Sequence, residues 1–139
     1  MRHALVLLCL CLAAVGCSAT PSAGAALSKI EVTDPRYKGL VFLVATVRRA
    51  GTDFVISNDS TQPWFDVAIA LTGSGADEYL LHLDEIDAGQ TVSAASARFA
   101  TAAGRPFDAA HDMPPTLVIS AEIGEGGPTG VYAVRLSRP

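Results

Sequence analysis

Cysteine is absent from the chain after position 17. The three cysteines, Cys9, Cys11 and Cys17, all lie in or at the end of an apolar N-terminal run. The remainder of the chain therefore cannot form an internal disulfide bond and must rely on its hydrophobic core for stability.

Charged residues are also scarce, and the basic ones are scattered. Only 17% of the 139 residues are charged, with ten Lys and Arg against fourteen Asp and Glu, for a net charge of −4. Phosphate binding needs clustered Lys and Arg, so a nucleic acid is excluded as a partner. Half of the residues are hydrophobic, which is too apolar for a disordered chain. The length fits one domain.

Long hydrophobic runs are missing apart from one short run near the N-terminus. After the basic start at 1–3, residues 4–16 are thirteen apolar or small residues without a charge. A membrane-spanning helix needs about 20 such residues. The length and flanks instead predict a signal peptide over residues 1–16.

The end of that run, Ala-Val-Gly at 14–16 followed by Cys17, resembles the lipobox of bacterial lipoproteins. The resemblance implies cleavage after Gly16, a diacylglycerol thioether on Cys17 and acylation of the new amine, so the membrane is a partner through lipid. Several acyl chains together give stable anchoring. Ser18 stands where Asp would favour the inner membrane, so the resemblance implies the outer membrane, with the domain at its periplasmic face. The alternative is an ordinary secretory signal cleaved after Ala19, which would release a soluble protein.

A tether and one β domain follow the leader. Residues 17–26 are small, polar and contain Pro and Gly, as in a flexible linker, so the domain is expected over 27–139. Short strands alternate there with Gly, Pro and Asp turns, and the pattern predicts seven or eight strands forming an all-β, immunoglobulin-like β-sandwich. A small closed barrel is the alternative. The expected strands cover 27–33, 40–48, 53–58, 64–72, 78–83, 91–99, 116–123 and 131–136.

Three of these segments carry more detailed expectations. Residues 40–48 are apolar on both faces and predict a buried central strand. Strict alternation in 64–72 predicts that Phe65, Val67, Ile69 and Leu71 share one face. In 91–99, Phe99 is out of phase, which indicates a bulge.

Part of the domain resembles the extracytoplasmic immunoglobulin-like domains of bacteria, and most closely the F-x-L-Y-D family of small sandwiches. The resemblance covers Phe-Val-Ile-Ser-Asn at 54–58 with Ser60, the alternating strand at 64–71, and Ala-Gly-Gln-Thr at 88–91 before Phe99. Thr72-Gly73 stands where the Tyr-Asp of that family would be. The resemblance implies a fold and an adhesive or accessory role, without naming a ligand.

Few residues carry recognisable chemistry. Asp108, His111 and Asp112, with Met113, are candidate metal ligands, but one His and two Asp in a loop are too few for a closed site, so no metal and no cofactor are expected. Carboxylates at 78–87 indicate a solvated edge strand. No nucleophile motif is present, so the protein is not expected to be an enzyme.

Trp64, the only tryptophan, is either a core residue or a binding aromatic on a contact surface. Its neighbours at 66, 68 and 70 are small or polar, which puts it on the less apolar side of its strand. The whole pattern predicts a lipid-anchored envelope protein with a non-catalytic binding, accessory or structural module, and an envelope protein as a possible partner. The alternative is a periplasmic carrier of a small ligand or a metal, using His111 and its acidic neighbours.

Overall fold

The computed structural model describes residues 24–73, 77–112 and 114–136. These ranges contain no helix long and apolar enough to cross a membrane. Short strands dominate them, joined by two 3₁₀ turns. The elements are η1 (Pro35–Tyr37), β1 (Val41–Phe42), β2 (Ala45–Ala50), β3 (Asp53–Asn58), β4 (Trp64–Thr72), β5 (Tyr79–Ile86), β6 (Thr91–Ala94), η2 (Ser96–Arg98), β7 (Thr116–Ile123) and β8 (Thr129–Arg135).

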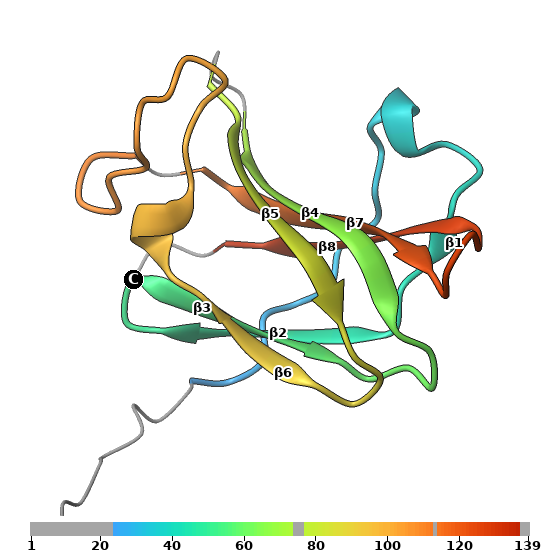
Figure 1. The fold of residues 1–139 in the computed structure, drawn as a ribbon. Coiled ribbons are helices and arrows are strands. Elements are labelled where there is room, and N and C mark those ends of the chain that lie inside the picture. The colour runs from blue at the N-terminus through green and yellow to red at the C-terminus, as the bar shows by residue number, and fades with distance from the viewer. Residues whose placement is uncertain (1–23, 74–76, 113, 137–139) are drawn as a thin grey trace, which may run out of the picture.

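The strands form two sheets that pack face to face (Figure 1). One sheet has the order β1-β8-β7-β4-β5 and the other β2-β3-β6. All pairs are antiparallel except β1 with β8. The predicted all-β sandwich of seven or eight strands is therefore confirmed, with eight strands in the described residues, and the sheets do not close into a barrel. The order β8-β7-β4-β5 is that of the G-F-C-C′ sheet of immunoglobulin-like domains.

The main core lies between the two sheets. Alternate residues of β3 face inward, as a period of two predicts, and β7 turns Leu117, Ile119 and Ala121 toward this core. Val118, on the other side of β7, is buried as well. The Phe99 ring packs edge-on against Phe54 at 6.0 Å and against Phe107 at 6.5 Å. The largest fully buried side chains are Trp64, Phe54, Phe99, Ile56, Ile69, Leu71, Ile86, Leu117, Ile119, Val47, Val67 and Val131.

The segment 40–48 differs from its prediction. It is divided between β1, at the edge of the large sheet, and β2, in the other sheet. Leu43 and Val47 are buried, whereas Val41, Phe42 and Val44 are 44%, 58% and 58% exposed. A single central strand would have buried both faces. The chain instead crosses between the sheets, so half of this apolar run faces solvent.

The alternation in β4 also differs from the strict period predicted. The register against β7 shifts between Phe65 and Ala68, and Asp66 has a φ of +48°. This inserted residue is a β-bulge. It leaves Phe65 half-buried and places Trp64 in the core beside the face of Val67. The prediction that Trp64 lies on the less apolar side of its strand was therefore wrong.

Two further local expectations are corrected. Residues 91–99 form β6 followed by the 3₁₀ turn η2, and it is this turn, not a bulge, that brings Phe99 inward. Residues 27–33 form no strand but only one isolated bridge, between Lys29 and Val134, and a second bridge pairs Ala26, just before this segment, with Arg48. Backbone pairing to β2 begins as early as Gly24, whose N–H donates to the carbonyl of Arg49.

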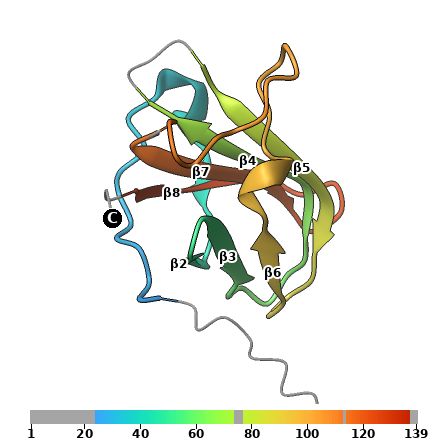
Figure 2. The same cartoon turned by 90° about the vertical axis from the view of Figure 1, so that its left-hand side faces the viewer.

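Residues 30–40, here called the strap, cover the outer face of the five-stranded sheet. In Figure 2 the strap runs along the side of the large sheet away from β2, β3 and β6. Four side chains of the strap pack on a second apolar cluster of the sheet. The strap contributes Ile30, Val32, Tyr37 and Leu40, and the sheet Ala70, Leu80, Val118, Val131 and Ala133.

Candidate functional site

The strap is held to the sheet by side chains more than by its backbone. The Ile30 N–H donates to the carbonyl of Ala133. Apart from the β1–β8 ladder, the next backbone hydrogen bond to the sheet runs from the Leu43 N–H to the carbonyl of Val131. Within the described residues, the backbone bonds recorded between these points stay inside the strap. Asp34 begins η1 by accepting from the Arg36 N–H, and Pro35 fits the first turn because it has no N–H to satisfy.

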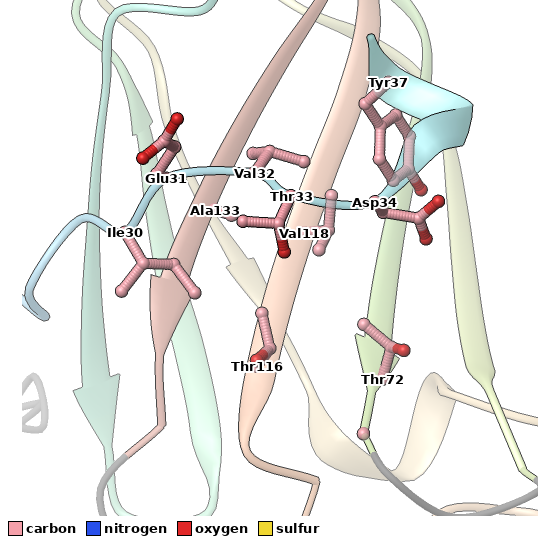
Figure 3. Close-up of a pocket in the computed structure, with 11 residues that line it drawn as sticks. Ile30, Glu31, Val32, Thr33, Asp34, Tyr37, Thr72, Thr116, Val118 and Ala133 are labelled. Carbon is pink, nitrogen blue, oxygen red and sulfur yellow. The ribbon is translucent and has the colours of Figure 1, made fainter.

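A cleft of about 180 Å³ lies between the strap and the outer face of β4, β7 and β8. Figure 3 shows the strap crossing the strands, with Thr116 and Thr72 of the sheet on one side of it and Glu31 pointing away on the other. The apolar lining comes from Ile30, Val32, Tyr37, Val118 and Ala133. The cleft thus has an apolar floor and a polar rim.

The charge at this cleft is acidic. Among the residues that the structure describes, its lining includes the carboxylates of Glu31 and Asp34 but no Lys, Arg or His. Arg36 lies just outside, with its guanidinium 2.8 Å from Asp34 and 3.4 Å from Glu78. The hydrogen bonds from Arg36 hold the pKa of Asp34 below its ordinary value, while burial raises the pKa of Tyr37. Both shifts favour an ionised Asp34 and a protonated Tyr37.

A second feature, the β1 edge, consists of the exposed side chains of Val41, Phe42 and Val44. Beside it, β1 and the loop between β3 and β4 enclose a groove of about 190 Å³. Trp64 lies at its base with a fully buried side chain, and its indole N–H has no partner among the described residues. Lys29 places its ammonium 4.6 Å from the centre of the Phe42 ring. This edge is an apolar surface with the ammonium of Lys29 at its margin.

Asn58 fixes the loop that forms the other wall of this groove. It is fully buried, and its amide Nδ2 donates to the carbonyls of Gln62, Ile86 and Asp87 at 2.8, 3.1 and 3.1 Å. Its Oδ1 accepts from both the N–H and the hydroxyl of Ser60. A buried polar side chain satisfied in this way locks its surroundings. The Asn-x-Ser of the family resemblance therefore has a structural role here.

The loop with the predicted metal candidates forms ion pairs instead of a ligand cluster. The His111 Nδ1 lies 2.7 Å from Asp108, whereas Asp112 binds Arg105 at 3.2 Å and accepts from the Asp108 N–H. Among the described residues, no three His, Cys, Asp or Glu side chains are placed to hold a metal ion. Arg105 also pairs with Asp77.

The His111–Asp108 pair has opposite effects on its two members. The hydrogen bond from His111 lowers the pKa of Asp108, and the same carboxylate raises the pKa of His111. Both side chains are exposed, so the pair belongs to a solvated loop.

The other predicted site residues are placed as follows. Trp64 is a core residue and not part of an exposed contact surface. Cys17 and Met113 lie outside the described residues. The acidic residues Asp84 and Glu85 are exposed on β5, which is an edge strand, as the solvated-edge interpretation expects.

Sequence reasoning missed the β1 edge because a continuous apolar run suggests burial. A signal was nevertheless present: Phe42 and Val44 have the same parity as Thr46 and Arg48, whose polar side chains indicate the outward face of the segment. The strap was missed because its apolar residues are spaced irregularly.

Comparisons with models of known protein families, with curated proteins and with solved structures found no match for this chain.

Proposed function

We propose that this protein is a bacterial envelope lipoprotein, anchored through Cys17, whose β-sandwich is a non-catalytic binding module. The observation that carries the binding role is the exposure of Phe42 and Val44 beside an apolar groove. Large exposed apolar side chains gathered at one place are typical of interaction surfaces. The proposed partner is another envelope protein.

The position of the N-terminal side of the domain supports this role. Gly24 pairs with Arg49, near the end of β2, whereas Val44 directly precedes its start at Ala45. Five residue steps along the strand separate Val44 from Arg49, roughly 16 Å at 3.3 Å per residue. In Figure 1 the first coloured residues lie at the lower left and β1 at the far right. The β1 edge therefore lies at the opposite end of β2 from the point at which a lipid-anchored tether would join the domain.

Crosslinked pull-down from envelopes tests the binding role. The double variant Phe42→Ser with Val44→Ser should capture at least tenfold less envelope protein than the wild type does. A matched control makes the same two exchanges elsewhere, Val55→Ser with Phe65→Ser, at half-buried outward positions. Equal capture by both variants and the wild type would overturn the role of the β1 edge.

The anchor is tested separately. Fatty acid labelling should mark the wild type, and Cys17→Ser should remove both the label and the membrane association. Mass spectrometry that found an unmodified amino end at Thr20 would instead establish the ordinary secretory signal and exclude the lipid anchor. A partner could still bind the β1 edge in that case.

A second candidate function, a small-ligand carrier, is favoured by one observation, the cleft beneath the strap. A cavity that combines an apolar floor with a few convergent polar groups is the usual form of a ligand site.

A further inference from the structure

We propose that the cleft beneath the strap binds a small organic amine of monocyclic size, with its apolar body on the sheet and its ammonium at the threonine-lined rim. This inference rests on the second candidate function and is independent of the anchor and of the β1 edge. The binding site and the ligand class follow from volume, lining and charge.

The volume sets the size of the ligand. A cavity of about 150 Å³ lined by apolar side chains accommodates benzene. The cleft is of similar size, about 180 Å³, so it can hold one six-membered ring or a short chain with a small head group. Larger ligands would have to displace the strap.

The floor supplies the apolar contact. Val118 and Ala133 are buried on the outer face of the sheet, and Val32 and Tyr37 pack against the same cluster from the strap. An inserted ring would extend this second cluster. Val118 and Ala133 are already shielded from water, whereas Ile30, Val32 and Tyr37 of the strap are only half-buried. Covering the apolar surface that these strap side chains still expose is the favourable term that such a contact provides.

The rim supplies hydrogen-bond groups. Thr72 and Thr116 are paired residues of β4 and β7, and their side chains lie on the same side of the strap as that of Thr33 (Figure 3). Hydroxyl oxygens accept hydrogen bonds, and an ammonium offers three donors. The rim can therefore orient an amine.

Charge decides between an amine and an acid. Among the described lining residues, the carboxylates are those of Asp34, which is paired with Arg36, and of Glu31, which points away from Thr72 and Thr116 (Figure 3). No Lys, Arg or His is among these lining residues. Arg135 faces Thr116 in the β7–β8 ladder but does not line the cleft. The lining therefore favours a cation over an anion.

The strap provides a route of entry. No sheet hydrogen bond fixes its backbone between the Ile30 N–H and β1 within the described residues. Segments held mainly by a few side chains open at low free-energy cost compared with core strands. A ligand can enter without breaking the β-ladder.

Three ligands of nearly equal shape test the proposal: benzylamine, benzyl alcohol and benzoate. Each is titrated into the purified full-length protein while the amide NMR signals of Val118 and Ala133 are followed. Benzylamine should saturate these signals with a dissociation constant of about 1 mM, and benzoate should bind at least tenfold more weakly. Absent shifts with all three, or benzoate binding as tightly as benzylamine, would overturn the proposal.

Variants connect the result to the cleft. Thr116→Phe fills it and should abolish binding of benzylamine, whereas Thr129→Phe, at the exposed far end of the same sheet, should retain it. Asp34→Asn keeps a residue that can cap η1. Combined with Glu31→Gln, it should reduce benzylamine affinity to that of benzyl alcohol and leave benzyl alcohol unchanged. Unaltered benzylamine binding by Thr116→Phe or by the double variant would contradict the site or its charge rule. Neither result depends on the capture of an envelope protein.

Discussion

Trp64 and Val67 lie three residues apart on β4, yet both side chains are fully buried in the same core. In an unbroken strand, residues an odd number apart point to opposite faces. The bulge at Asp66 supplies the extra residue that brings them together. It thereby places the indole beneath the groove at the β1 edge.

We expect Trp64→Ala to destabilise the fold by about 4 kcal/mol, because truncating a buried aromatic leaves a cavity. Urea unfolding followed by circular dichroism measures the change. Phe65→Ala is the control: its side chain is half-buried on the other face, so it should cost less than half as much. Equal losses would contradict the assignment of Trp64 to the core.

The bulge predicts opposite effects for the same substitution on two paired strands. Asp66→Gly should stabilise the protein by about 0.5 kcal/mol, because glycine adopts a positive φ without a Cβ clash. Asp84→Gly, on the neighbouring exposed stretch of β5, should instead destabilise it by about 0.5 kcal/mol, since glycine loses more backbone entropy in an ordinary strand. Thermal unfolding of both variants decides, and a loss of stability in Asp66→Gly would be inconsistent with the bulge.

Asn58→Ala should destabilise the domain by about 3 kcal/mol. The change removes the donors to three backbone carbonyls and the acceptor for Ser60, and buried groups left without partners are costly. Ser60→Ala removes only the hydroxyl and should cost about 1 kcal/mol. Chemical denaturation of the two variants tests this order, which the reverse ranking would refute.

The His111–Asp108 pair predicts a pH dependence with a definite sign. Because Asp108 raises the pKa of His111, the contribution of the pair is lost as the pH rises through the imidazole pKa. Because His111 lowers the pKa of Asp108, the contribution is also lost as the pH falls through the carboxyl pKa. Both effects are small, since the side chains are exposed.

An NMR titration of the His111 ring measures this shift. The imidazole pKa should lie above its ordinary value in the wild type and fall in Asp108→Asn, although Asp112 still favours the charged ring. Asp77→Asn, which alters a carboxylate paired with Arg105, should leave it unchanged. A pKa insensitive to Asp108→Asn would show that the pair does not form in solution.

The sequence predicted the elements with regular alternation and failed where the chain changes sheet. The strand at 116–123 was predicted with its inward face, and the one at 53–58 with its bounds, because a period of two survives when a strand stays in one sheet. The run 40–48 has no such period. Only packing shows that Leu43 turns inward while Phe42 and Val44 remain outside.

The candidate sites depended still more on tertiary structure. The cleft joins residues 30–37 to strands that begin at Trp64 and Thr116, and no local pattern brings such distant segments together. Likewise, the candidate metal ligands near His111 are neighbours in sequence, but Asp112 forms an ion pair with Arg105. Chain proximity placed these side chains in one loop without deciding their partners.

By itself, the sequence determined an all-β domain. Apolar residues that alternate with polar ones all lie on the same face when the chain is an extended strand, so a sheet can bury them together. The sequence also predicts lipidation of Cys17 through its resemblance to the lipobox, because that pattern consists of a few consecutive residues. The tertiary structure alone decided that Trp64 is buried, that β1 is exposed and that the strap encloses a cleft. These features arise from one inserted residue, one crossing between sheets and one covering segment, each fixed by contacts between residues far apart in the chain.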